Sequence, residues 1–368
     1  MTVRRVARRL ALLALGLSIG ALVAEAMLRG AAAASDRIDQ LLEDPLAAKI
    51  EPHGTLGYRQ RPLAVSHYGN GTSATANRLG FRGPEVSVQK PAGTVRVVLL
   101  GGSTSHGVGV NDNETIDAYL RTILAGELPT RRIEVVNLAF DGYDSYQDFE
   151  RLRTDGLPLD PDVVIVNSGI NDVRNAWIDD VYDRDPRTVL WGGILIRLRE
   201  EQKRGGPTLW TRIRHYSYIA RTPSMVRGLG RAERQLPPPS WTPTLAAADN
   251  FERNLARIAQ MAAERPIPVV FSTPPSALGT PRFAPTDTSD RSYWLPTAAM
   301  TQAYRDELDQ RMRHLIQQLQ ARGQQVSYVP HHLQPSAFLD DAHLTPQGNR
   351  EMAEDFARSV LSLLSARD

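Results

Sequence analysis

The sequence contains no cysteine, and this absence excludes thiol nucleophiles, disulfide bonds and thiolate metal sites. An excess of either charge is also missing, because 43 basic and 41 acidic residues leave a net charge of +2. No basic stripe with interleaved aromatic residues is present, so we expect no nucleic-acid partner. Hydrophobic residues make up 42% of the 368 positions, which is typical of a globular protein with one large domain or one domain and an appendage.

Long apolar runs are rare, and the one that stands out covers residues 10–27, interrupted only by Ser18 and Glu25. Its length approaches the roughly 20 residues that cross a bilayer. Four arginines precede it, at positions 4, 5, 8 and 9. The positive-inside rule then places the N-terminus in the cytoplasm and the rest of the chain outside. We expect residues 1–30 to be a single-pass anchor in the inner membrane; the alternative is a cleaved signal peptide and a secreted or periplasmic protein.

Residues 31–94 form a polar lead-in with many glycines and prolines, for which we expect irregular structure outside the cytoplasm. Its distinctive stretch is Leu-Gly-Phe-Arg-Gly-Pro at positions 79–84. We interpret this stretch as a strap packed on the main domain, with a loop facing the substrate as the alternative. The main domain then covers residues 95–366, with an insertion at about 173–245 that is too long for a simple crossover.

Five short aliphatic runs occur in the main domain, at residues 95–100, 133–138, 163–166, 269–271 and 326–329. Helical spacing of apolar residues occurs between and after them, at 115–124, 146–152, 245–263, 301–319 and 349–364. This alternation predicts an α/β fold in which helices cover both faces of a parallel sheet. Ligands of such sheets bind beyond the carboxyl ends of the strands. The residues that we consider as candidates for a functional site come after these runs in the sequence.

Ser103 comes directly after the first aliphatic run and the pair Gly101-Gly102. A strand-to-helix turn exposes a serine hydroxyl and aims backbone N–H groups at a developing negative charge. Serine after glycine is also a common helix cap, so this motif alone is weak. The Gly-Lys-Ser/Thr ending of a phosphate-binding loop is missing, which disfavours a nucleotide site.

Gly142 and Asn171 follow the second and third runs and are candidate oxyanion donors. A glycine lets its backbone N–H approach a substrate oxygen, and a carboxamide NH2 can donate to one. An ordinary turn is the alternative for either residue, and Asn171 is the sharper signal of the two. We expect Asp172, the next residue, to hold its loop through hydrogen bonds rather than to perform chemistry.

Asp340 and His343 supply a candidate base and the carboxylate that orients it. Their spacing places them on the same side of one helical turn, so the carboxylate binds one ring nitrogen while the other faces serine. Asp341 is the rival orienting residue. His106 is a weaker alternative base, and the neighbouring pair His331 and His332 lacks a carboxylate at a recognisable metal-ligand spacing.

These motifs resemble the SGNH (GDSL-type) hydrolases, whose conserved blocks occur in the same order over roughly residues 95–366. The matching positions are Ser103, Gly142, Asn171, and Asp340 with His343. The resemblance implies a flavodoxin-like three-layer α/β/α fold and ester hydrolysis without a metal or another cofactor. It also implies that the Ser103 backbone N–H, the Gly142 N–H and the Asn171 side chain bind the oxyanion. Family members often carry aspartate before the serine, where this chain has Gly102.

We therefore predict an exported serine esterase, with O-acetyl groups on an envelope carbohydrate as the favoured substrate. The alternatives are a lipid-directed esterase, an O-acyltransferase that uses the same acyl-enzyme, and a non-catalytic polysaccharide-binding or assembly protein. Aromatic residues in the insertion suit a sugar, an anionic polymer or a helical subdomain with its own core. They are Trp177, Trp191, Trp210, Tyr216, Tyr218 and Trp241.

Overall fold

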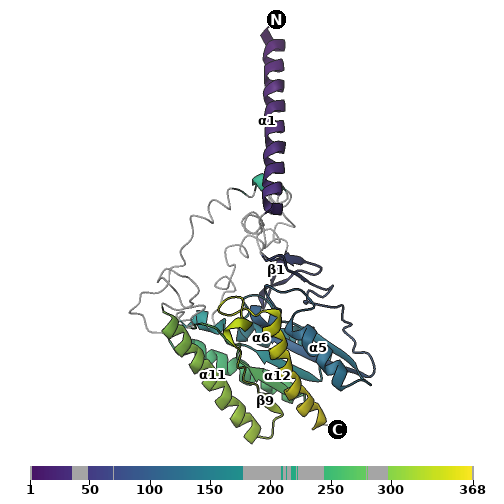
Figure 1. Ribbon diagram of the computed structural model, residues 1–368, viewed down its shortest axis with the longest axis vertical. Helices are drawn as coiled ribbons and strands as arrows, with labels where there is room; N and C mark the ends of the chain where they lie inside the picture. Colours follow the sequence, from purple (N-terminus) through teal and green to yellow (C-terminus); the bar gives the residue numbers. More distant parts are fainter. Residues whose placement is uncertain are drawn as a thin grey trace.

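The computed structural model describes residues 2–34, 49–68, 70–176, 209, 213, 217–220, 222, 244–278, 280 and 297–366. Figure 1 shows helix α1 (Thr2–Ala34) extending away from a layered α/β domain. One stretch of this helix, Arg5–Ala31, is long and apolar enough to cross a membrane. Of the six aromatic residues expected to characterise the insertion, only Tyr218 lies within the described residues.

A five-stranded parallel sheet forms the centre of the domain, in the order β6-β5-β7-β8-β9. Its strands are β5 (Thr94–Gly101), β6 (Arg132–Asn137), β7 (Val163–Asn167), β8 (Val269–Ser272) and β9 (Val326–Tyr328). All five aliphatic runs are thus confirmed as strands. Every residue of β5 and β7 is buried, which explains their continuous apolar sequences.

Helices cover both faces of this sheet and create two separate cores. On one face α5 (Ile116–Glu127) and α12 (Pro346–Ser365) pack on alternate strand residues such as Val97 and Leu99. The other face carries Val98 and Leu100. Three helices pack there: α6 (Ser145–Arg151), α10 (Ala246–Ala263) and α11 (Ala298–Ala321). The predicted three-layer α/β/α fold is therefore confirmed.

Two of the helices begin three residues before their predicted starts because of their caps. The Thr297 side chain accepts a hydrogen bond from the Met300 N–H at 3.1 Å and starts α11 at Ala298. Thr345 caps α12 in the same way through the Gly348 N–H at 3.2 Å, and Pro346 occupies the first helical position. The polar caps precede the apolar periodicity on which the prediction rested.

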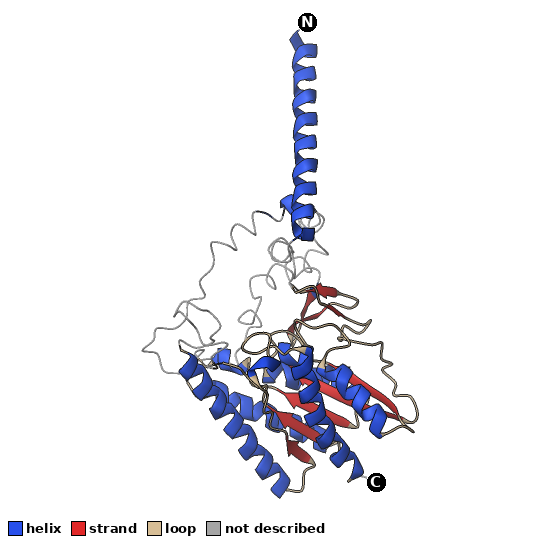
Figure 2. Ribbon diagram, in the orientation of Figure 1, coloured by secondary structure: helices blue, strands red, loops and turns tan. Residues whose placement is uncertain are grey.

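The lead-in contains two antiparallel hairpins, so the expectation of irregular structure is wrong for this part. They pair β1 (Ile50–His53) with β2 (Gly57–Gln60), and β3 (Val65–His67) with β4 (Ser73–Thr75). Figure 2 shows these short strands between α1 and the main sheet. The strands have only three or four residues each, which is too short for clear alternation of apolar and polar side chains.

The first hairpin is held by a small core of its own. Ile50, Leu56 and Tyr58 are buried against Phe140 and Tyr143 of the loop after β6. The Tyr58 hydroxyl donates to the Asp141 carbonyl at 2.6 Å, and the Tyr143 hydroxyl donates to the Tyr58 carbonyl at 2.9 Å. The lead-in therefore packs on the loop that contains Gly142.

Candidate active site

Ser103 begins the short helix α4 (Ser103–His106) at the carboxyl end of β5. The turn requires glycine at position 101, where φ is 146° and a Cβ atom would lie 2.5 Å from the Asn167 carbonyl oxygen. Gly102 then caps α4 in an extended conformation. Because the chain reverses so tightly, the half-buried Ser103 lies at the edge of the sheet where ligands of parallel sheets bind.

The structure brings Ser103, His343 and Asp340 together in one hydrogen-bonded series. His343 Nε2 lies 2.9 Å from Ser103 Oγ, and His343 Nδ1 lies 2.7 Å from Asp340 Oδ2. Asp340, rather than its rival Asp341, therefore contacts the imidazole ring. Both separations are short enough for proton transfer from the hydroxyl to the ring and for stabilisation of the resulting imidazolium.

The backbone conformation that places Asp340 beside the ring differs from the expected helical turn. Residues 340–342 form bends, and none of the residues 340–343 is helical. Asp340 Oδ1 accepts hydrogen bonds from the backbone N–H groups of Ala342 and His343, at 2.9 and 2.7 Å. This local turn leaves Oδ2 facing the imidazole. The two side chains are in contact, but not through the helical turn on which the prediction rested.

The electrostatics of the pair favour an ionised carboxylate beside a basic imidazole. Burial by itself lowers the pKa of His343, but the hydrogen bond and the charge of Asp340 outweigh it and raise this pKa above the usual 6.5. Burial likewise opposes ionisation of Asp340, yet its hydrogen bonds with His343 and Ala342 lower its pKa below the usual 3.8. Each group therefore stabilises the charged form of the other.

The loop that carries His343 is fixed by contacts from two other segments. The Asp341 carbonyl accepts hydrogen bonds from Ser276 Oγ at 2.8 Å and from the Ala277 N–H at 3.0 Å. Thr104 Oγ1, next to Ser103, donates to the Ala342 carbonyl at 3.1 Å. The serine turn and the histidine loop are thus joined directly, a connection that the sequence did not indicate.

Asn171 and Gly142 lie beside the serine turn, at the ends of the strands that flank β5. Asn171 Nδ2 donates to the Tyr143 carbonyl at 2.9 Å, which fixes the orientation of the carboxamide. A Cβ atom on Gly102 would lie only 2.4 Å from the same nitrogen. Gly142, whose φ is 77°, precedes Tyr143 in the adjoining turn. The loops that carry the two candidate donors lie next to the serine turn because β6, β5 and β7 are neighbours in the sheet.

Asp172 supports the Asn171 loop, as predicted. Its carboxylate accepts hydrogen bonds from Ser145 through the backbone N–H, at 3.2 Å, and through Oγ, at 2.5 Å. Asn254 of α10 donates to Ser145 Oγ at 3.0 Å. Asp144 caps α6, which begins one residue before the predicted helical stretch at 146–152. Asn254 was missed because it lies in the middle of an amphipathic helix.

Arg82, in the predicted strap, is fully buried and holds the loop that follows α4. Its guanidinium donates to the carbonyls of His106, at 2.7 Å, of Val110, at 2.6 Å, and of Gly107. Its Nε also pairs with Asp112 at 3.0 Å. The segment at 79–84 is therefore a strap that holds the loop directly after the short helix of Ser103.

The other histidine candidates contact groups outside the site around Ser103. His106 is buried, its Nδ1 lies 3.1 Å from the Ala139 carbonyl oxygen, and burial lowers its pKa to about 4. His331 Nδ1 contacts Asp355 at 2.8 Å. Among the described residues, no group of three or more His, Cys, Asp or Glu side chains is arranged to hold a metal ion.

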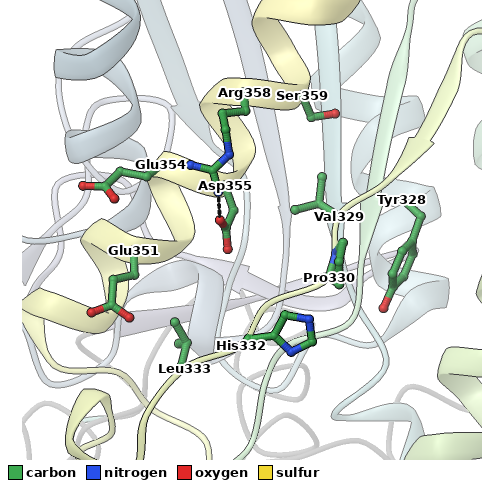
Figure 3. Close-up of a pocket in the computed structure, with 10 residues that line it drawn as sticks. All are labelled: Tyr328, Val329, Pro330, His332, Leu333, Glu351, Glu354, Asp355, Arg358 and Ser359. Carbon is green, nitrogen blue, oxygen red and sulfur yellow. Dashed lines mark hydrogen bonds and ion pairs between the residues drawn. The ribbon is translucent and has the colours of Figure 1, made fainter.

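A cavity of about 620 Å³ lies between the end of β9 and α12, away from Ser103. Figure 3 shows His332 and Tyr328 on one side of this cavity and Glu351, Glu354 and Asp355 on the other. None of the candidate catalytic or oxyanion residues lines it. This cavity is therefore separate from the site around Ser103.

The sequence model of the GDSL-like Lipase/Acylhydrolase family matches residues 99–351, a span that includes every candidate catalytic and oxyanion residue. The chain belongs to this family. Its members are carboxylic ester hydrolases, so this protein is an enzyme of that class. A search of curated proteins found no match.

Solved structures with similarity to this chain include other members of the family. A GDSL-like lipase from Bacteroides thetaiotaomicron VPI-5482 has 15% identity and a TM-score of 0.38, covering 74% of this chain and 92% of its own. Axe2, an acetylxylan esterase from Geobacillus stearothermophilus, has 14% identity and a TM-score of 0.39, with coverages of 73% and 95%. The α/β hydrolase LAE5 from the metagenome of Lake Arreo has 16% identity and a TM-score of 0.41, with coverages of 74% and 98%.

Proposed function

We propose that this GDSL-family enzyme is a serine esterase whose nucleophile is Ser103 and whose substrates are O-acetyl groups on an envelope carbohydrate. The observation that carries the proposal is the continuous series of hydrogen bonds from Ser103 Oγ through His343 to Asp340, at 2.9 and 2.7 Å. A binding protein has no need of a base beside a hydroxyl, so this series agrees with the enzyme class of the family and not with the non-catalytic alternative.

In the first half of the reaction, Ser103 Oγ attacks the acyl carbonyl while His343 Nε2 takes the hydroxyl proton. The Asp340 carboxylate stabilises the imidazolium that forms. The oxyanion accepts hydrogen bonds from the Ser103 and Gly142 backbone N–H groups and from the Asn171 carboxamide. The tetrahedral intermediate then collapses, and the alcohol leaves with the proton from His343.

The second half regenerates the enzyme. His343 removes a proton from water, and the resulting hydroxide attacks the acyl group on Ser103. A second tetrahedral intermediate forms on the same three donors, and its collapse releases the acid and returns the proton to Ser103. A sugar hydroxyl in place of water would give acyl transfer instead, by the same steps.

The location and the substrate class are proposed from α1. The candidate membrane span, 5–31, and the arginines at its N-terminal end support a signal anchor in the inner membrane with the enzyme outside the cytoplasm. Export of this kind exposes Ser103 to the carbohydrates of the cell envelope. This is the reason for favouring a carbohydrate ester over a lipid ester.

Ser103→Ala tests the proposed nucleophile. With p-nitrophenyl acetate as the substrate of the detergent-solubilised full chain, we expect kcat/KM to fall roughly a thousandfold or more, since the nucleophile is lost. Ser105→Ala is the matched control, because Ser105 lies on the same turn but its Oγ accepts from Asn167 rather than facing His343. Equal turnover by wild type and Ser103→Ala would contradict the assignment.

Acyl chain length and acceptor choice test the substrate class. We expect release of acetate from glucose pentaacetate and little release of fatty acid from phospholipid vesicles. A preference for long acyl chains would support the lipid-directed esterase instead. Transfer of acetate to an added glycan at the expense of hydrolysis would support the acyltransferase.

A further inference from the structure

One face of α1 is partly covered near its C-terminal end, in contrast to the rest of the helix. The described side chains from residue 5 to residue 30 are exposed except at three positions, and a fourth follows at residue 31. These half-buried residues are Ala24, Glu25, Leu28 and Ala31. Their spacing of three and four residues places them on one side of the helix. The helix therefore has a contact face, which a simple tether does not need.

Glu25 accepts three hydrogen bonds on this face, and all three donors belong to residues of the insertion. Its carboxylate accepts hydrogen bonds from Ser217 Oγ at 3.0 Å, the Tyr218 N–H at 3.0 Å and the Ile219 N–H at 3.1 Å. One turn further along α1, Arg29 pairs with Glu25 at 2.8 Å and lies over the Tyr218 ring, 4.9 Å from its centroid. Two residues of the helix thus hold the same short segment.

The position of Glu25 makes these contacts informative. It lies within the apolar stretch Arg5–Ala31, where a carboxylate is unfavourable unless partner groups compensate it. Three donors and an arginine provide that compensation. A signal peptide that is removed has no use for such a site, and cleavage near Ala24 or Ala26 would destroy it.

We propose that Glu25 docks the segment 217–220 of the insertion on a membrane helix that is retained in the mature protein. A groove of about 750 Å³ runs along this contact, with Ala21 and Leu22 on the helix facing Ile213 and Ile219 on the insertion. Because Ala21 and Leu22 belong to the apolar span, the docked segment lies at the outer surface of the membrane. The inference rests on the membrane anchor proposed above, but it does not depend on ester hydrolysis.

Cysteine cross-linking tests the docking, because the chain has no cysteine of its own. Leu22→Cys with Ile219→Cys places two thiols in the same groove, and a short bis-maleimide is added to membranes that contain the full chain. We expect rapid intramolecular cross-linking. The control pair, Leu15→Cys with Ile219→Cys, moves the first thiol two turns, about 10 Å, toward the N-terminus on the same side of α1. We expect this pair to react slowly.

Glu25→Ala and Glu25→Gln in the Leu22/Ile219 background test the role of the carboxylate. Both remove the charge, and we expect cross-linking to slow about tenfold because hydrogen bonds to an ionised group are lost. Met27→Ala, at an exposed position of α1, should leave the rate unchanged. Thermal unfolding of the detergent-solubilised variants shows whether the catalytic domain remains folded, since neither of its cores includes α1.

Three results would overturn the proposal. They are equal cross-linking of the two cysteine pairs, a rate unaffected by both Glu25 variants, and a native protein whose mass shows that it begins after Ala26. Ser103→Ala in the same background separates this inference from the proposed function, because it should abolish esterase activity without slowing the cross-link.

Discussion

At the scale of single residues, this chain has Gly102 where family members often carry aspartate before the serine. The atoms around Gly102 explain why a side chain does not fit there. The Asn171 carboxamide occupies the space that a side chain at position 102 would need, with Nδ2 only 2.4 Å from an ideal Cβ. The Tyr143 carbonyl oxygen, 3.1 Å from the same point, closes the other side. Glycine at this position therefore permits the close approach of a candidate oxyanion donor to the nucleophile turn.

Gly102→Ala should displace the Asn171 carboxamide and break its 2.9 Å hydrogen bond to the Tyr143 carbonyl. Loss of one oxyanion donor lowers catalysis on the order of a hundredfold, so we expect kcat/KM for p-nitrophenyl acetate to fall by about that factor. Gly126→Ala is the control, because a Cβ there meets no atom within 4 Å. Unchanged kinetics in Gly102→Ala would show that Asn171 is not a donor in the reaction.

At the scale of secondary-structure elements, the strap at 79–84 stabilises the segment that follows the nucleophile. Arg82 has no exposed side-chain surface and distributes its N–H groups over three carbonyls of one loop, at His106, Gly107 and Val110. A guanidinium can do this because its five donors are held in one plane. The strap is therefore part of the active-site framework although it precedes the main domain in sequence.

Arg82→Lys tests this role, because an ammonium keeps the charge but cannot reach all three carbonyls. We expect the free energy of unfolding to fall by about 3 kcal/mol, the usual effect of leaving buried polar groups unpaired. Urea denaturation followed by circular dichroism measures it. Arg78→Lys, at an exposed position directly before the strap, should change stability by less than about 0.5 kcal/mol. A similar small change in Arg82→Lys would contradict the proposed role.

The elements also show which parts of the structure a sequence can reveal. The five strands were predictable because residues such as Val97 and Leu99 form continuous apolar runs that only a doubly covered strand produces. The residues around Ser103 and His343 were predictable because polar motifs follow those runs. The role of Arg82 was not, because its acceptors are backbone carbonyls 24 to 28 positions away, which leave no mark in the sequence. The hairpins were missed because their strands are too short for a pattern.

At the scale of the whole molecule, helix α1 and the hairpin β1–β2, which both precede the sheet, depend on the catalytic domain to different degrees. Helix α1 contributes no residue to either large core. The hairpin β1–β2, in contrast, buries Ile50, Leu56 and Tyr58 against Phe140 and Tyr143. Gly142 lies between these two aromatic residues in sequence, so the hairpin packs against a segment that carries a candidate oxyanion donor.

Two truncations should therefore behave differently. Removal of residues 1–48 should leave thermal unfolding and hydrolysis of p-nitrophenyl acetate close to those of the full chain, because only α1 and the segment after it are lost. Removal of residues 1–61 also exposes Phe140 and Tyr143, and three buried apolar side chains at about 2 kcal/mol each predict a loss of several kcal/mol of stability. We also expect kcat to fall, because the Tyr58 hydroxyl no longer holds the Asp141 carbonyl beside Gly142. Equal stability and kcat in the two truncated proteins would show that the first hairpin is a passive appendage, and that the sheet and its helices alone position the oxyanion loop.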